Sequence, residues 1–191
     1  YRQAYIEVPR KNGKSNLCAA IALYMLFADG EPGAEIISAA GDRNQARIVF
    51  EIASAMCATN PKLSGHGKVL RNTIEYKNSF YKAISAEANT KHGFNAHAVI
   101  LDELHVFPDR DLYDVLKTST GARTQPLVIA ITTAGHDTSS ICFELHEYAQ
   151  KVKEGSIQDD TFLPVIYAAD KDDDWTQEAT WAKANPGFGT I

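Results

Sequence analysis

Cysteine is scarce in this sequence, and its spacing excludes the common cysteine-based sites. The 191 residues contain three cysteines, Cys18, Cys57 and Cys142. They are far apart, lie in apolar surroundings and form no Cys-x-x-Cys pair, the spacing typical of zinc and redox motifs. We therefore expect three reduced core residues of an intracellular protein, and neither a disulfide framework nor a zinc site.

Long apolar runs and net positive charge are missing as well. The longest apolar stretch, residues 17–28, is shorter than the ~20 residues that a membrane-spanning helix needs, so it predicts a buried helix and no membrane partner. The net charge is −5 and the pI about 5.7, so any contact with nucleic acid must be local. The first strand begins almost at residue 1, and we expect the chain to be part of a longer protein.

Short apolar strands alternate with helices, a pattern that predicts an α/β fold with three layers and a mostly parallel central sheet. The expected strands are residues 4–8, 34–40, 96–101, 127–132 and 162–168, and the expected helices are residues 14–28, 42–58, 112–118, 139–153 and 175–185. Residues 68–84 form short stretches broken by turn residues, which predict an antiparallel insert. We expect one domain at residues 1–169, followed by a polar linker at residues 170–191.

A phosphate-binding turn is predicted between the first strand and the first helix, at Asn12, Gly13, Lys14 and Ser15. A Gly-Lys-Ser turn at a helix start offers backbone N–H groups and a lysine to phosphates, and a hydroxyl to magnesium. The strict motif requires glycine five residues before Gly13, where Val8 stands. The position between strand and helix still favours a P-loop nucleoside triphosphatase of the ASCE or RecA-like kind.

An acidic pair follows a central apolar strand. Asp102 and Glu103 come directly after Val99-Ile100-Leu101, and ligands of open parallel sheets bind beyond the carboxyl ends of strands. We assign Asp102 to magnesium, through water, and Glu103 to the water that attacks the phosphate, as a catalytic base. Together with the turn, the pair predicts binding of ATP and Mg²⁺, with Ser15 as the second metal ligand.

Other polar residues receive weaker assignments. Pro9, Arg10 and Lys11 precede the turn, and the two cations add positive charge over the phosphate site. Thr132 and Thr133 end the next buried strand, where they could contact the γ-phosphate or Glu103. His92, His97 and His105 lack metal-ligand spacing and are expected to be solvated or core residues, and the acidic run at residues 172–174 is expected to solvate the linker.

The chain resembles the ATPase domain of tailed-bacteriophage terminase large subunits, the motors that package viral DNA. The resemblance is carried by residues 6–15, 42–46, 92–97, 99–105, 132–135 and 181–186. It implies that Arg10, Gly13, Lys14 and Ser15 form a deviant phosphate loop with Arg10 in a catalytic role, that Asp102 and Glu103 are the acidic pair, and that Thr132 and Thr133 are a coupling motif. Gln45 lies in a helicase-like segment and receives a weak site role.

The resemblance also implies partners: double-stranded DNA, a homo-oligomeric ring, the terminase small subunit and the portal, in the host cytoplasm. A nuclease domain is expected after residue 191. A neighbour in the ring would supply a cation, but Lys91 and His92 stand where an arginine is expected, so this cation is unassigned; Arg71 and Arg123 are further candidates.

Two alternatives remain open. The box Asp102-Glu103-Leu104-His105 also fits a DEAD-like helicase or translocase, which needs a second motor lobe. A nucleotide-dependent binding module with negligible turnover is the other alternative, because Val8 replaces a glycine of the strict motif.

Overall fold

The computed structural model describes residues 1–86 and 93–189, and its central element is a buried strand. Within these residues the sheet has eight strands in the order β3-β4-β5-β2-β6-β7-β1-β8. The strands are β1 (Gln3–Glu7), β2 (Glu35–Ala40), β3 (Lys68–Val69), β4 (Thr73–Tyr76), β5 (Ser79–Ser85), β6 (Ala96–Asp102), β7 (Leu127–Thr132) and β8 (Phe162–Ile166). All seven residues of β6 are buried, as expected for a strand covered on both faces.

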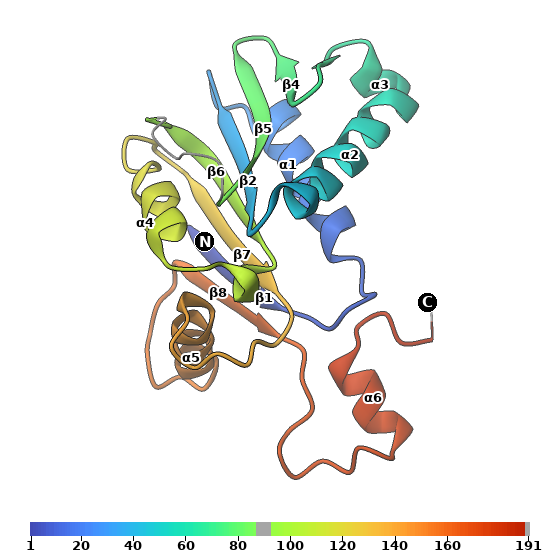
Figure 1. The fold of residues 1–191 in the computed structure, drawn as a ribbon, viewed down its shortest axis with the longest axis vertical. Coiled ribbons are helices and arrows are strands. Elements are labelled where there is room, and N and C mark those ends of the chain that lie inside the picture. The colour runs from blue at the N-terminus through green and yellow to red at the C-terminus, as the bar shows by residue number, and fades with distance from the viewer. Residues whose placement is uncertain (87–92, 190–191) are drawn as a thin grey trace.

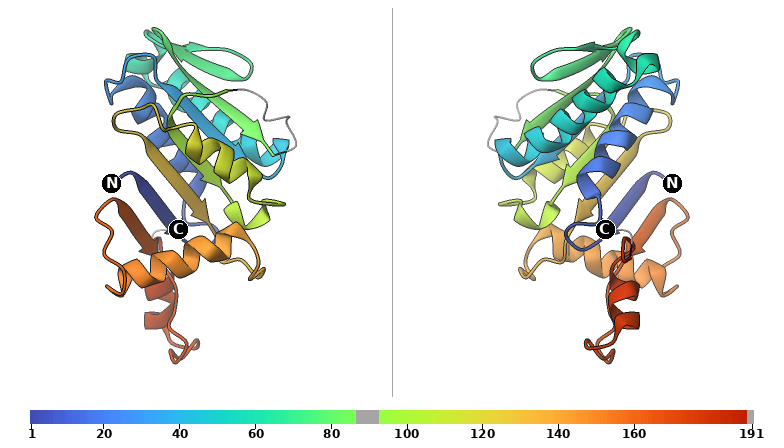
Figure 2. Two further views of the ribbon diagram at one scale, coloured as in Figure 1. Left: turned by 90° about the vertical axis from the view of Figure 1, so that its left-hand side faces the viewer. Right: turned by 90° about the vertical axis from the view of Figure 1, so that its right-hand side faces the viewer.

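Helices cover both faces of the sheet, which confirms the predicted three layers (Figure 1). They are α1 (Lys14–Phe27), α2 (Arg43–Thr59), α3 (Pro61–Ser64), α4 (Asp111–Thr118), α5 (Ile141–Lys153) and α6 (Glu178–Ala184), and a 3-10 turn, η1, spans Leu104–Val106. The two views of Figure 2 show α4 and α5 in front of one face and α1 and α2 in front of the other.

Strand alternation decides which layer each side chain joins. Along β6, Ala98 and Ile100 belong to the core under α1 and α2, whereas Val99 and Leu101 belong to the core under α4 and α5. Because successive side chains of a strand point to opposite faces, Asp102 continues the set that faces α1. The alternation of side chains along β6 therefore directs the Asp102 carboxylate toward α1, which begins at Lys14.

The antiparallel segment that the sequence predicts at residues 68–84 is present as β3, β4 and β5. β3 and β4 are antiparallel, and β4 pairs antiparallel with β5, but β5 itself runs parallel to β2 in the main sheet. β3, β4 and β5 thus extend one edge of the central sheet. The length and the turns of this segment could be read from the sequence, whereas the pairing of β5 with β2 depends on residues far apart in the chain.

The first two helices begin and pack as their local sequences dictate, with one exception. The Asp42 side chain caps α2 by accepting from the N–H groups of Asn44 and Gln45, at 2.7 and 3.0 Å. The apolar run at residues 17–28 was expected to be a buried helix, but Leu17 and Tyr24 of α1 are exposed. It covers only one face of the sheet and leaves its outer side to solvent.

Cys18, Cys57 and Cys142 are free and buried, which confirms that they are core residues. Among residues 1–86 and 93–189, no helix has the length and apolar character needed to cross a bilayer.

Candidate functional site

The turn after β1 places a lysine and a hydroxyl at the start of α1. Gly13 adopts a left-handed conformation, with φ of 75°, which glycine tolerates at little cost, and it directly precedes the helix. Its carbonyl accepts from the N–H of Leu17 at 3.0 Å, so the helix begins regularly at Lys14. Ser15 is half-buried, and Lys14 is buried with 8% of its surface exposed.

Val8 occupies the position where the strict motif has glycine, and the structure shows why valine fits. Its N–H donates to the carbonyl of Thr132 at 3.1 Å, so Val8 extends the pairing of β1 with β7 by one residue. Its carbonyl lies 3.4 Å from the Lys14 ammonium. The left-handed turn falls later, at Lys11, with φ of 69°. Val8 is therefore a core residue directly after β1, 5% exposed, and the turn is made without a first glycine.

Asn12 fastens the turn to the C-terminal segment. Its amide nitrogen donates to the carbonyls of Pro9 and Arg10 at 3.3 and 3.2 Å. The same nitrogen lies 3.2 Å from Asn185 Oδ1, and Asn12 Oδ1 accepts from the N–H of Gly187 at 2.9 Å. The segment after α6 therefore lies against the turn (Figure 1). Asn185 and Gly187, from the part of the chain expected to be a linker, contact the predicted phosphate turn through Asn12.

Asp102 ends β6 as a buried carboxylate. It is 2% exposed, and its Oδ1 atom has no hydrogen-bond partner within the described residues. Burial, with the nearby charge of Glu103, raises the pKa of Asp102 to about 6, and Lys14 acts in the opposite direction. Burial is also the main reason that the pKa of Cys18 on α1 is raised, and the charge of Asp102 adds to it. The carboxylate therefore faces the first turns of α1, as strand alternation indicated.

We predict that Asp102→Asn stabilises the protein in the absence of metal and nucleotide. The pKa of Asp102 rises from 3.8 to about 6 on folding, so ionisation opposes folding. The penalty is absent below pH 3.8, grows between the two values and is complete above pH 6. At pH 7.5 the variant should gain roughly 3 kcal/mol in the free energy of unfolding.

Urea unfolding in EDTA, at pH 7.5 and at pH 4, measures this difference. The gain should fall to roughly 0.5 kcal/mol at pH 4, where wild-type Asp102 is protonated in the folded protein. Asp172→Asn, which changes an exposed aspartate of the C-terminal segment, is the matched control and should have no effect at either pH. An equal gain at both values would mean that charge burial is not the cause.

Glu103 adopts a backbone conformation that is rare for its residue type. It has φ and ψ of 52°, in the left-handed region, which costs roughly 1–2 kcal/mol for a residue with a Cβ. Its carboxylate is held on two sides. Oε1 lies 3.4 Å from the Lys14 ammonium, and Oε2 lies 3.4 Å from both the N–H and the hydroxyl of Thr133. Strain of this kind is concentrated at functional sites.

The two threonines at the end of β7 point to different places. Thr133 contacts Glu103, which is one of the two contacts that the sequence suggested for this pair of threonines. Thr132 is fully buried on the α5 side of the sheet, where its Oγ1 atom lies 3.0 Å from His105 Nδ1 and 3.8 Å from Cys142 Sγ. Only Thr133 therefore touches the acidic pair directly, and Thr132 reaches it through His105.

A cavity of about 610 Å³ joins the two halves of the site. The residues that line it are Arg10, Lys11, Gly13, Lys14, Ser15, Asn16, Asp42, Gln45, Ile48, Ile52, Glu103, His105 and Val106. The predicted cations, the helix-opening hydroxyl and the acidic residue thus face one space, at the carboxyl ends of the parallel strands. Gln45 also lines it. The predicted site residues outside this lining are Pro9, Asn12, Asp102, Thr132 and Thr133.

Sequence reasoning missed several cavity residues. His105 was expected to be solvated or in the core, yet it contacts Glu103 and Thr132; the Asp-Glu-x-His box was the available signal. Asp42, Ile48 and Ile52 reach the cavity from α2 and the residue before it, and a single sequence carries no signal for that approach. His97, in contrast, is a core residue, 2.7 Å from Asp29.

The donor set fits a hydrated magnesium ion. Carboxylate, hydroxyl and water oxygens are the ligands that magnesium prefers, and Asp102 Oδ1 is a buried oxygen without a partner in the described part of the chain. Within residues 1–86 and 93–189, no group of three or more His, Cys, Asp or Glu side chains could hold a metal ion unaided. A metal here would need ligands from substrate and water, as magnesium usually takes them in nucleotide sites.

The structure describes two of the four candidates for a trans-acting cation, Arg71 and Arg123, and neither lines this cavity. Arg123 lies near the amino-terminal ends of β2 and β6, where it donates to Glu31 and to the carbonyls of Pro32, Gly33 and Asn95. In this structure Arg123 therefore joins the loops that precede these two strands. Arg71 is exposed in the turn between β3 and β4. Lys91 and His92 lie outside the described residues.

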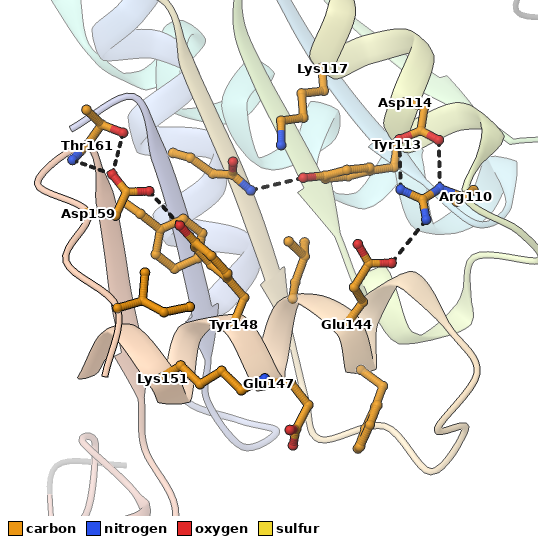
Figure 3. A pocket seen from close by; sticks show the side chains of 15 residues that line it. Arg110, Tyr113, Asp114, Lys117, Glu144, Glu147, Tyr148, Lys151, Asp159 and Thr161 are labelled. Carbon is orange, nitrogen blue, oxygen red and sulfur yellow. Dashed lines mark hydrogen bonds and ion pairs between the residues drawn. The ribbon is translucent and has the colours of Figure 1, made fainter. Parts of the chain in front are cut away.

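A second cavity of about 610 Å³ lies between α4 and α5. Figure 3 shows that its charged walls pair with each other: Arg110 with Asp114 and Glu144, and Tyr148 with Asp159. Its lining contains neither the acidic pair nor any residue of the phosphate turn. The first cavity is therefore the candidate site.

Comparison with known proteins points to one family. The family model described as "Terminase large subunit, ATPase domain" matches residues 1–151. The terminase large subunit of Enterobacteria phage HK97 is 34% identical over 198 residues, covering 98% of this chain and 38% of that protein. The crystal structure of the HK97 large terminase matches with a TM-score of 0.87 and 32% identity, over 98% of this chain and 40% of that chain.

More distant structures share the fold. The ATPase domain of a Thermus phage large terminase, in a mutant form, matches with a TM-score of 0.57 and 15% identity, covering 80% of this chain and 82% of that chain. Together with the HK97 structure, it confirms the predicted P-loop α/β fold of the ASCE type. This chain spans 38% of the length of the HK97 protein, so activities of the whole protein reach beyond it.

Proposed function

This chain belongs to the terminase large subunit ATPase domain family, and from that premise we propose that it hydrolyses ATP with magnesium to drive double-stranded viral DNA into a procapsid. One observation carries the proposal. Lys14 and Ser15, at the start of α1, share a cavity with Glu103, directly beside the buried Asp102. A phosphate chain and a hydrated cation fit between a helix N-terminus and such a carboxylate pair.

The phosphates are held by the turn between β1 and α1. The N-terminal end of α1 provides partial positive charge, and Lys14, Arg10 and Lys11 provide full charges that face the cavity. Lys14 contacts the outer phosphates and leaves its present partner, Glu103, to do so. Arg10 acts on charge that develops during transfer. Pro9, Asn12 and Gly13 shape the turn, since Asn12 ties its carbonyls together.

Ser15 and Asp102 would hold the magnesium ion, Asp102 through water. The bound ion would supply positive charge that neutralises the phosphate oxygens. Metal binding would also relieve the unfavourable burial of the Asp102 carboxylate, because a nearby cation favours the ionised form. The orphaned Oδ1 atom supports this role.

Glu103 orients and deprotonates the attacking water. General-base help of this kind contributes about 10²- to 10⁴-fold in rate. Thr133, which contacts the Glu103 carboxylate, and Thr132, which reaches it through His105, connect the site to β7 and α5. These contacts support the coupling role of the two threonines, by which the state of the site would alter the position of neighbouring elements.

The partners follow from the family and extend beyond this chain. We propose that the chain acts in the host cytoplasm within a homo-oligomeric ring, with double-stranded DNA, the terminase small subunit and the portal. Residues 1–169 form the motor domain, and residues 170–191 connect it to a nuclease domain. The family match favours this motor over a DEAD-like helicase. A neighbouring copy supplies the further cation.

Phosphate release from ATP by the isolated chain tests the proposal. In dilute solution we expect release that requires magnesium and stops in EDTA, at a rate below the ~1–100 s⁻¹ of kinases. The rate per chain should rise with protein concentration, because association brings in the neighbour's cation. Absence of release at every concentration would favour a binding module without turnover. A rate of ~1–100 s⁻¹ in dilute solution would contradict the trans-acting cation.

A further inference from the structure

His105 stands between Glu103 and Thr132 and reaches both with one ring nitrogen. Nδ1 lies 3.0 Å from Thr132 Oγ1 and 3.3 Å from Glu103 Oε2. The backbone N–H of His105 also lies 3.3 Å from Thr132 Oγ1. His105 lies on η1, two residues after the strained Glu103. Its side chain is 19% exposed and lines the cavity.

The hydrogen bonds around Thr132 determine where the imidazole proton is. The Thr132 hydroxyl has one proton, which it donates to the carbonyl of Thr133 at 2.8 Å. Its oxygen must therefore accept from His105, and an ionised Glu103 carboxylate can only accept. Both partners of Nδ1 are acceptors, so Nδ1 carries a proton. Burial lowers the pKa of His105, although the charge of Glu103 acts in the opposite direction. The lowered pKa favours the neutral ring, whose one proton is then on Nδ1.

The surroundings hold the ring in this position. A Cβ added to Gly135 would come within 3.2 Å of the His105 Cβ, so the loop after β7 packs directly against the histidine. On the other side, Thr132 is fully buried and is also contacted by Cys142 on α5. The imidazole therefore has little freedom to leave its two acceptors.

We propose that His105 is a positioning residue that holds the Glu103 carboxylate for attack on the phosphate. The inference rests on the proposed role of Glu103 and deepens it. In the present arrangement Lys14 holds Oε1, whereas His105 and Thr133 hold Oε2. When Lys14 turns to the phosphates, the contacts to Oε2 remain. They keep the carboxylate in place on its strained backbone and aim Oε1 into the cavity.

Three substitutions of His105 separate positioning from packing. The amide nitrogen of asparagine can take the place of Nδ1–H, whereas the amide of glutamine lies nearer the place of Nε2. His105→Ala and His105→Gln should lower kcat roughly 10- to 100-fold, the value of a hydrogen bond to a charged group, with little change in KM. His105→Asn should keep kcat within about threefold of wild type.

Steady-state hydrolysis, nucleotide titration and thermal unfolding of each variant give the answer. A normal kcat for His105→Ala, or equal losses for the alanine and asparagine variants, would overturn the inference. A raised KM and a lowered Tm with unchanged kcat would also overturn it, since these are the effects of lost packing. Glu103→Gln separates the proposed role of Glu103 from that of His105. If this variant keeps turnover, the role of Glu103 fails. If Glu103→Gln is inactive while His105→Ala has normal kcat, only the role of His105 fails.

Discussion

Glu103→Gln should abolish ATP turnover and leave nucleotide binding intact. The substitution keeps the size of the side chain and its contacts with Thr133 but removes the carboxylate that accepts a proton from water. We expect kcat to fall about 10²- to 10⁴-fold, the usual contribution of a general base. The variant also loses the ion pair that holds Lys14 at 3.4 Å, so its affinity for ATP should be equal to that of wild type or tighter.

Single-turnover hydrolysis and titration with a non-hydrolysable nucleotide measure the two effects separately. Glu51→Gln is a matched control, because Glu51 lies on α2, exposed and paired with Arg47. It should hydrolyse ATP at the wild-type rate. Turnover by Glu103→Gln at that same rate would exclude Glu103 as the base. A large loss of affinity would instead mean that Glu103 acts on binding.

Lys14→Ala should weaken ATP binding more than any other single change in the phosphate turn. Lys14 is the one cation of the turn that is buried, and its ammonium is held in the cavity by Glu103 and by the carbonyl of Val8. Its contact with phosphate is a charge-assisted hydrogen bond, worth about 1.5–3 kcal/mol. We therefore expect the Kd for ATP to rise roughly 10- to 100-fold.

Isothermal titration with a non-hydrolysable nucleotide and magnesium tests this expectation. Lys62→Ala removes a lysine from α3, which lies at the far end of α2 from the cavity (Figure 1), and it should bind ATP normally. The comparison separates a local contact from a change in net charge. Equal affinities for wild type and Lys14→Ala would place the phosphates elsewhere on the protein.

The opposing interactions of Lys14 and Glu103 connect these two expectations. In the free protein each neutralises the other, and the buried lysine has a partner while no phosphate is bound. An unpaired buried charge is costly, so this pairing stabilises the open site. Glu103→Gln and Lys14→Ala should therefore not be additive in nucleotide affinity, since each removes the same ion pair.

Local patterns were sufficient for the elements and for the two motifs. The apolar run of β6, the Asp42 cap of α2 and the Gly-Lys-Ser turn depend on neighbours in the chain, and the structure has each of them. The place of Asp102 also followed from strand alternation, which is a local rule. Long-range pairing, such as that of β5 with β2 in parallel, could not be read from these local patterns.

His105 shows most clearly what the sequence could not supply. Its role depends on Thr132, 27 residues later, and on the close approach of Gly135. Nothing in the spacing of histidines indicates that one ring nitrogen lies between a carboxylate and a buried hydroxyl. The same holds for the contacts of Arg123 with Glu31 and with the carbonyls of Pro32 and Gly33, which no local pattern indicates.

By itself, the sequence determined the order of strands and helices, the phosphate turn and the acidic pair, because hydrophobic period and turn chemistry act between residues close in the chain. Only the tertiary structure decided that the C-terminal segment contacts the turn through Asn12, that Thr132 meets His105 and that Thr133 meets Glu103. These contacts join residues far apart in the chain, and burial and packing of the whole sheet, not any local preference, bring them together.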